Sequence, residues 1–260
     1  MRRPLLLALS MLAMAPGLAR AEGPSPTPAP VAAPQRSPAP DFFFAPPRGS
    51  FSIRGSWDVL QANSDWYGFV RQQLTLERGD FSLFGIAGDV NFSLTPRFDL
   101  VVGADYFGQS TDSEYRDFVD NLRQPIQQTT RLREGSVTGG VRYALRERGR
   151  AVSSLAWIPT RIVPYVGGGG GFLWYNLEQY GDFVDFADFS VFGDLLPSDG
   201  IAPTAYVQAG ADIQLVKRLY VTFDARYKWA KSKLDDVVWT GFDPLDLGGV
   251  KLSTGLTVTF

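Results

Sequence analysis

Apolar and polar side chains alternate along most of the chain from residue 50 onward, most clearly in the last eleven residues. In VKLSTGLTVTF, Leu252 and Leu256 share one face of an extended strand, whereas Lys251 and Thr257 share the other. A period of two, with turn residues between segments, predicts half-buried β-strands. We therefore expect eight strands, at about residues 51–61, 81–94, 98–108, 130–145, 162–177, 203–215, 219–230 and 250–260.

The connections between these strands alternate in length. Residues 95–97 and 216–218 form short turns, whereas the connections after the first, third, fifth and seventh strands are long. Short turns at one end and long loops at the other are typical of bacterial outer-membrane barrels, whose short turns face the periplasm. Residues 146–161 are long but fall on the short-turn side. We expect them to lie along the inner membrane surface, with Trp157 and Ile158 in lipid.

The polar face of the strands separates a membrane barrel from a soluble one. It carries Ser, Thr, Gly, Gln and Tyr with isolated charges, whereas a soluble lipocalin-like barrel would have an outer face rich in Lys and Glu. In lipid, only helices and closed barrels pair every backbone polar group. The sequence therefore predicts an all-β fold: an eight-stranded antiparallel up-and-down transmembrane β-barrel with long extracellular loops and short periplasmic turns.

The first 50 residues differ in composition. A basic start, an apolar run over residues 5–15 and an Ala19-Arg20-Ala21 cleavage site predict a secretory signal peptide over residues 1–21. Nine prolines follow before residue 50, which predicts a Pro-rich periplasmic linker over 22–49 and a barrel domain over 50–260. Removing the peptide leaves 22 basic and 27 acidic residues, a net charge of −5, which argues against nucleic acid as a partner.

Two segments resemble a known group of proteins. VKLSTGLTVTF resembles the C-terminal strand of outer-membrane β-barrel proteins. Residues 164–171 (PYVGGGGG) resemble a strand of small OmpA-like, OmpW-like and opacity-type eight-stranded barrels. The resemblance covers roughly residues 49–260 and implies that the barrel-assembly machinery recognises the last strand, through Leu256, Val258 and Phe260. The glycines make room for bulky lumen residues or allow sharp coiling, and they leave open which face of strand 162–177 is outward.

The composition excludes several kinds of active site. The chain has no histidine and no cysteine, which removes Ser/His and Cys/His catalysis and Cys/His metal sites. The charged residues on the polar faces are Arg54, Asp58, Asp89, Asp99, Asp105, Arg142, Asp212, Asp224, Arg226, Lys228 and Lys251. They form either an ion pathway or a salt-bridged plug. Because the interior of an eight-stranded barrel is just wide enough for side chains, we expect these charges to form salt bridges that close the lumen to ions. We expect no cofactor and no enzyme activity.

Two long loops contain patterns that are not strand-like. In residues 181–194 (GDFVDFADFSVFGD), Asp182, Asp185 and Asp188 recur every three residues, as do four phenylalanines. Period three suits a short 3₁₀ turn, with the phenylalanines folded over the barrel mouth. A partner-binding surface is the second interpretation, and a calcium site is the last because the consensus spacing is absent. Residues 111–124 begin with a capping box and continue at helical spacing, which predicts a short helix.

These patterns favour a non-enzymatic outer-membrane protein with a structural or surface-interaction role through its extracellular loops. The alternative is a narrow channel for small or apolar solutes, as an OmpW-like resemblance implies, and a third is an envelope-lipid enzyme. Expected partners are outer-membrane lipid and lipopolysaccharide, the barrel-assembly machinery and an extracellular partner of the loops. The linker and the C-terminus are expected in the periplasm. The outer loops are acidic, whereas the inner turns carry Arg97, Arg146, Arg148, Arg150, Lys217 and Arg218.

Overall fold

The computed structural model describes residues 43–154 and 156–260, and most of its regular structure is antiparallel sheet. The expected signal peptide and the linker up to residue 42 lie outside the described residues. In the two described ranges, no helix has the length and apolar character needed to cross a membrane. The elements are β1 (Gly49–Leu60), α1 (Asp65–Gln73), the 3₁₀ helix η1 (Arg78–Phe81), β2 (Leu83–Ser93), β3 (Phe98–Val119), β4 (Pro125–Ala144), β5 (Gly149–Ser153), β6 (Ala156–Pro159), β7 (Ile162–Val184), β8 (Val191–Val216), β9 (Leu219–Ser232), β10 (Leu245–Asp246) and β11 (Gly249–Thr259).

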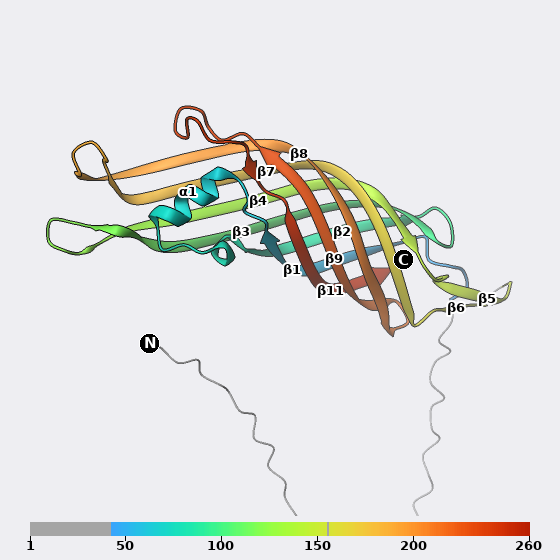
Figure 1. The fold of residues 1–260 in the computed structure, drawn as a ribbon. Coiled ribbons are helices and arrows are strands. Elements are labelled where there is room, and N and C mark those ends of the chain that lie inside the picture. Colours follow the sequence, from blue (N-terminus) through green and yellow to red (C-terminus); the bar gives the residue numbers. More distant parts are fainter. Residues whose placement is uncertain (1–42, 155) are drawn as a thin grey trace, which may run out of the picture. The chain divides into compact units, whose positions relative to one another are not determined.

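Eight of the strands close into a ring (Figure 1). Each pairs antiparallel with its neighbours in the order β1, β2, β3, β4, β7, β8, β9, β11, and β11 pairs with β1 from Gly249↔Leu60 to Thr259↔Ser50. The two-residue β10 pairs with the end of β9, outside the ring. The predicted eight-stranded up-and-down barrel is therefore confirmed, and each predicted strand corresponds to one strand of the ring.

The two ends of this barrel are built differently. We call one the turn end: it holds the turns after β2 and β8, the small β5–β6 hairpin and the C-terminal Phe260. The opposite end, the loop end, holds α1 and the tips of the β3–β4 and β7–β8 hairpins, and it lies on the left in Figure 1. The alternation of short and long connections in the sequence thus corresponds to two chemically distinct ends.

The outer wall of the barrel is an apolar band. Ile53, Leu256 and Val221 lie side by side on β1, β11 and β9, and the Ile53 side chain is 55% exposed. Aromatic side chains border the band at the turn end (Phe51, Phe92, Phe98, Tyr143, Phe260) and at the loop end (Trp57, Phe84, Tyr106, Trp174, Trp229). An apolar band between two aromatic girdles is the surface that a barrel presents to lipid.

Strand β7 contains the five consecutive glycines, whose facing the sequence leaves open. Tyr165 is buried and Val166 is exposed, so the odd-numbered residues of β7 face the lumen. A Cβ atom added at Gly169 would lie 2.9 Å from the Tyr206 hydroxyl and 2.3 Å from the Gly139 carbonyl oxygen. The lumen-facing glycines therefore leave space for bulky lumen side chains, which was one of the two explanations offered by the sequence.

Two hairpins continue beyond the band at the loop end. β3 and β4 pair in unbroken register as far as Glu114↔Gln127, and β7 and β8 pair as far as Val184↔Val191. The helix expected over residues 111–124 is therefore wrong, because residues 111–119 are strand. The capping-box pattern is a local signal, whereas pairing with β4 satisfies the same backbone groups along the whole segment. The 3₁₀ turn expected within 181–194 is likewise replaced by two strands and a short turn at 185–190.

The segment 146–161, which was expected along the inner membrane surface, folds into a small hairpin. It forms the β5–β6 hairpin, and Trp157 packs edge-on against Phe43 with ring centroids 5.6 Å apart. The backbones of these two residues exchange two hydrogen bonds of 2.8 Å. Trp157 is half-buried and Ile158 is exposed, and their position in lipid stays a prediction.

Candidate functional site

A ladder of buried ion pairs fills the lumen, beginning at the turn end. Arg142 on β4 donates from Nε to Asp99 on β3 and from Nη1 to Asp212 on β8, both at 3.2 Å. Arg148 lies 2.6 Å from the same Asp99 oxygen, and the Arg142 guanidinium lies 4.5 Å from the centre of the Tyr165 ring. Asp99 is almost wholly buried, so protein groups, not water, must balance its charge.

A second layer lies further into the barrel. Arg54 on β1 pairs with Asp89 on β2, and Arg226 on β9 lies 3.7 Å from both Asp89 and Asp224. The Tyr165 hydroxyl donates a hydrogen bond of 2.9 Å to Asp224 and links this layer to the first. Each buried charge thus has an opposite charge within reach, which offsets the cost of removing it from water.

The third layer lies closest to the loop end. Lys228 on β9 places its ammonium 2.7 Å from Asp58 on β1 and also against Glu134 on β4, while Lys251 on β11 pairs with Asp105 on β3. The structure brings all eleven charged residues proposed from the sequence into these three layers. The arrangement can hold opposite walls of the barrel together.

Two members of the ladder were absent from the sequence-based set. Glu134 and Arg142 are both even-numbered residues of β4, so they lie on the same face of the strand, and the Glu134 side chain is buried. The alternation of the sequence could therefore have predicted that Glu134 faces the lumen. Arg148 lies outside the ring strands, in the segment expected at the membrane surface, and no periodicity directs it inward. Its hydrogen bond to Ser93 and its ion pair with Asp99 depend on the hairpin that follows it.

An apolar plug covers the loop end of the lumen, beyond the third layer. Trp66, Tyr67 and Val70 lie at i, i+1 and i+4 on α1, which puts them on one face of the helix, and all three are buried. The connection of residues 61–82 therefore folds over the loop end of the lumen, where the backbone N–H of Thr75 donates to the Glu114 carbonyl oxygen on the extended part of β3 (Figure 1). The plug continues with Leu74, Leu76 and Phe81 and packs against Phe107, Leu132, Leu173, Tyr175, Leu177, Leu234, Trp239, Leu245 and Leu247.

Ring packing holds the plug. The Trp66 ring lies 5.1 Å from the Tyr67 ring and 5.7 Å from the Trp239 ring, both edge to face. Within the described residues, the Tyr67 hydroxyl and the indole N–H groups of Trp66 and Trp239 are buried without a hydrogen-bond partner. Burial raises the pKa of Tyr67 well above its usual value, with Glu134 as the next cause, so the phenol stays neutral. The plug thus gains its stability from apolar contact.

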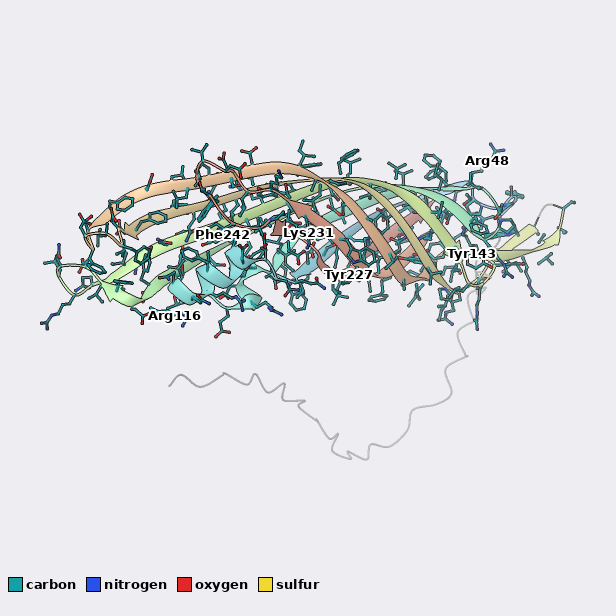
Figure 2. The ribbon with its side chains drawn as sticks, turned by 45° about the horizontal axis from the view of Figure 1, so that its top comes forward. Arg48, Arg116, Tyr143, Tyr227, Lys231 and Phe242 are labelled. Carbon is teal, nitrogen blue, oxygen red and sulfur yellow. The ribbon has the colours of Figure 1, made fainter. Side chains whose placement is uncertain are left out.

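The extended hairpins β3–β4 and β7–β8 form a four-stranded sheet beyond the ring, which we call the platform. At its tip, Phe118 packs against Phe186 and Phe189 at 5.8 and 6.0 Å, and the last two side chains are 53% and 65% exposed. Arg116 donates from Nε to the Arg71 carbonyl oxygen and so connects the platform to α1; it lies beside the helix in Figure 2. The platform therefore displays an exposed aromatic cluster on a hydrogen-bonded base.

Two of the three aspartates considered as calcium ligands serve the turn of the β7–β8 hairpin, and the third, Asp182, lies in β7. Asp185 accepts a hydrogen bond from the backbone N–H of Ala187, and Asp188 accepts one from that of Ser190. The hydrogen bonds from Ser190 lower the pKa of Asp188, so it is ionised at neutral pH. Over residues 43–154 and 156–260, no three side chains able to bind a metal gather in one place. Asp182, Asp185 and Asp188 thus act as an acidic rim beside the phenylalanines.

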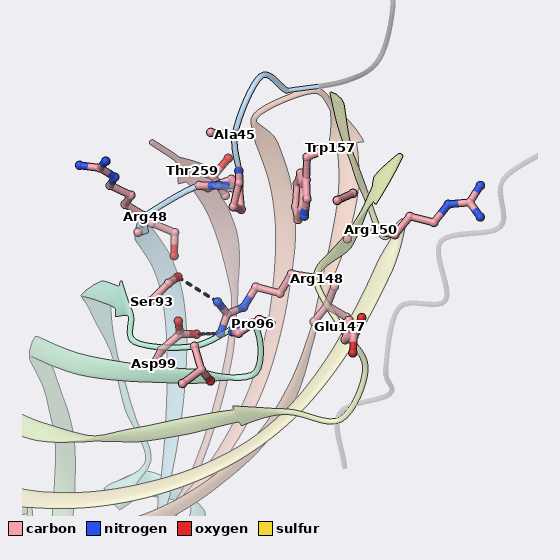
Figure 3. Close-up of a pocket in the computed structure, with 18 of the residues that line it drawn as sticks. Ala45, Arg48, Ser93, Pro96, Asp99, Glu147, Arg148, Arg150, Trp157 and Thr259 are labelled. Atoms are coloured by element: carbon pink, nitrogen blue, oxygen red, sulfur yellow. Dashed lines mark hydrogen bonds and ion pairs between the residues drawn. The ribbon is translucent and has the colours of Figure 1, made fainter. Parts of the chain in front are cut away.

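A cavity of about 920 Å³ opens at the turn end (Figure 3). Its floor is the first ion-pair layer, and its walls are the β5–β6 hairpin and residues 44–50. Figure 3 shows Arg148 directed inward to Ser93 and Asp99, whereas Arg48 and Arg150 point away from the cavity on opposite sides. The cavity ends at the ladder and does not continue into the plug.

Comparisons with known proteins identify similar barrels. No family model matches the chain, and no curated protein matches it. Neisserial surface protein A has a TM-score of 0.43 at 11% identity, covering 85% of this chain and 98% of that one. OprG from Pseudomonas aeruginosa has a TM-score of 0.46 at 12% identity, covering 84% and 99%. Ail, the attachment invasion locus protein of Yersinia pestis, has a TM-score of 0.41 at 14% identity, covering 82% and 99%.

Proposed function

We propose that this chain is a non-enzymatic outer-membrane barrel that is closed to ions and holds its platform outside the cell for contact with a partner. The observation that carries the proposal is the contrast between a filled lumen and an exposed, hydrogen-bonded platform. The apolar band and its aromatic girdles support insertion in a bilayer. Beyond the band, β3 and β4 remain paired up to an aromatic tip, which is more structure than a simple connection requires.

The filled lumen supports a closed barrel over the narrow channel considered as the alternative. A solute would have to displace three layers of paired charges and then the plug around Trp66 and Tyr67. Separating a buried ion pair leaves charges without solvation, at a cost of several kcal/mol for each. Displacing the plug would also expose its apolar side chains to water. The envelope-lipid enzyme is less supported, because the histidine that such chemistry commonly uses is absent from the sequence.

The orientation follows from the same proposal. A signal peptide over residues 1–21 directs export, and a linker over 22–49 and the turn end lie in the periplasm, with the platform outside. Lipid and lipopolysaccharide surround the band. The assembly machinery recognises the last strand through Leu256, Val258 and Phe260, whose side chains all point outward. Phe260 also closes the ring, because its carbonyl oxygen accepts a hydrogen bond from Arg48 N–H.

The chemistry of the platform tip indicates the kind of partner. Phe118, Phe186 and Phe189 supply apolar anchors, and aromatic anchors commonly carry much of the binding energy of an interface. Asp185 and Asp188 directly precede Phe186 and Phe189 in sequence and are exposed. An apolar cluster with an acidic rim favours a partner that combines apolar and cationic groups, since complementary charge speeds encounter.

Binding of purified barrel in nanodiscs to an immobilised peptide of alternating Lys and Leu tests this function. The combined F118S/F186S/F189S variant is expected to lose most of the binding, and D182N/D185N/D188N to weaken it in low salt. Val237→Ser is the matched control, because Val237 is an exposed apolar side chain at the same end but outside the cluster. No binding by the wild type, or equal binding by the triple-serine variant, would reject the partner role.

A further inference from the structure

The turn end carries many basic residues, and few of them belong to the ladder of ion pairs in the lumen. Segments 43–50, 94–97, 145–162 and 216–218 together contain one acidic residue, Glu147, which pairs with Arg97 at 3.5 Å. Arg148 is engaged with Asp99 in the lumen. We call the whole set the basic collar: Arg48, Arg97, Arg146, Arg148, Arg150, Arg161, Lys217 and Arg218. The collar therefore has a large excess of positive charge that side chains of its own segments do not balance.

The collar lies at the edge of the apolar band. Arg97, Arg161 and Arg218 each directly precede the first residue of a ring strand, and those residues are the outward-facing Phe98, Ile162 and Leu219. The backbone N–H of Arg48 donates to the Phe260 carbonyl oxygen, which places Arg48 beside the C-terminal member of the girdle. In Figure 2, Arg48 and Tyr143 both lie at this end, on opposite edges of the barrel in that view. Cations one residue beyond an apolar band lie at the depth of lipid headgroups.

The β5–β6 hairpin widens the collar. Arg150 on β5 is exposed, and next to it the hairpin carries the exposed apolar side chains of Val152 and Ile158. Two backbone hydrogen bonds between Phe43 and Trp157 hold the chain at Phe43 against the β5–β6 hairpin. An exposed surface that mixes cations with apolar side chains suits the boundary between lipid headgroups and acyl chains.

The partner of the collar is selected by charge and by geometry. A phosphate oxygen is the acceptor that guanidinium groups bind best. Because the collar surrounds the outer wall and does not converge on one point, its partner must be distributed around the barrel. We propose that the basic collar binds the headgroup phosphates of anionic phospholipids in the leaflet at the turn end. This inference rests on the membrane insertion proposed above, but not on the partner role of the platform.

Electron paramagnetic resonance of spin-labelled lipids tests the collar. The folded barrel is reconstituted in phosphatidylcholine vesicles that contain spin-labelled phosphatidylglycerol or phosphatidylcholine, and the motionally restricted fraction of each is measured. Wild type is expected to favour phosphatidylglycerol by at least about threefold, since each cation near an anionic surface adds to the attraction. The preference should fall as salt shortens the range of the charges.

Two variants with equal loss of charge make the test specific. R48Q/R146Q/R150Q/R161Q removes four exposed collar cations outside the ion-pair ladder and is expected to lose the preference. R123Q/R133Q/K231Q/K233Q removes four exposed cations at the loop end and is expected to keep it. Equal restriction of both lipids by wild type, or loss of the preference in the loop-end variant alone, overturns the collar proposal. Absence of any restricted lipid would instead overturn membrane insertion.

Discussion

Lys228 Nζ lies 2.7 Å from a carboxylate oxygen of Asp58, deep in the lumen, and the same ammonium contacts Glu134. The three residues come from β9, β1 and β4, no two of which are neighbours in the ring. One lysine thus connects three parts of the wall across the interior. Because Asp58 is fully buried, the contact replaces hydration that the carboxylate has lost.

Replacing Lys228 tests the value of this contact. Lys228→Met leaves Asp58 and Glu134 buried together without a cation, and it is expected to lower the free energy of unfolding by about 3–5 kcal/mol. Urea unfolding in lipid vesicles, followed by tryptophan fluorescence, measures the loss. The triple variant K228M/D58N/E134Q removes the two carboxylate charges as well and should recover most of the stability. Equal stability of Lys228→Met and wild type would show that the cluster does not hold the walls.

Tyr67 provides a test of the plug. Its hydroxyl is buried without a partner among the described residues, so Tyr67→Phe is expected to leave stability unchanged or to raise it by about 1–3 kcal/mol. Tyr67→Ala removes the ring and should cost about 3–5 kcal/mol. It should also make residues 61–82 sensitive to protease added at the loop end. A large loss in Tyr67→Phe would mean that the hydroxyl has a role the packing does not show.

The lipid-facing wall predicts a position-dependent cost of charge. Phe223 lies outward near the middle of the band on β9, whereas Ser110 lies outward on β3 beyond the loop-end girdle. Phe223→Arg is expected to destabilise the inserted barrel by about 2–4 kcal/mol, and Ser110→Arg by no more than about 1 kcal/mol. Urea titration of both variants in vesicles gives the comparison. Equal costs at the two positions would argue that the band does not face lipid.

Neighbouring glycines on β4 provide a matched pair for lumen packing. A Cβ at Gly140 would lie 2.5 Å from the Gly168 carbonyl oxygen and 2.6 Å from the Tyr206 hydroxyl, whereas one at Gly139 would meet nothing within 4 Å. Gly140→Ala is therefore expected to cost about 1–3 kcal/mol and Gly139→Ala much less. Unfolding measurements on both proteins compare the two faces. The reverse order would invert the inferred facing of β4.

The outer wall and the ladder could be predicted because successive side chains of a strand point to opposite faces, so a residue's position in the strand alone gives its direction. In β9 and β11 the alternation is strict, so Asp224, Lys228 and Lys251 are directed inward by the same rule that directs Phe223 to lipid. The glycines of β7 have no side chain to show parity, so the facing of that strand required the burial of Tyr165 and its neighbours.

The plug and the platform could not be predicted from local patterns. α1 is short, and only Trp66, Tyr67 and Val70 of its residues are buried, which is too weak a periodic signal to place it over the loop end of the lumen. Residues 111–119 combine a local helix signal with a strand partner that is visible only in the fold. Pairing with β4 makes residues 111–119 a strand despite the local helix signal. The ion pair with the distant Asp99 likewise directs the Arg148 side chain inward.

Recording ionic current across planar lipid bilayers containing the purified, folded barrel tests the central claim most directly. The account predicts no steady current, because three layers of paired charge cross the lumen and the plug covers its loop end. It also predicts that a variant in which a short Gly/Ser turn replaces residues 61–82 stays closed, because the ladder alone still blocks the passage. Reproducible conductance steps of fixed size in the wild-type protein would contradict the account.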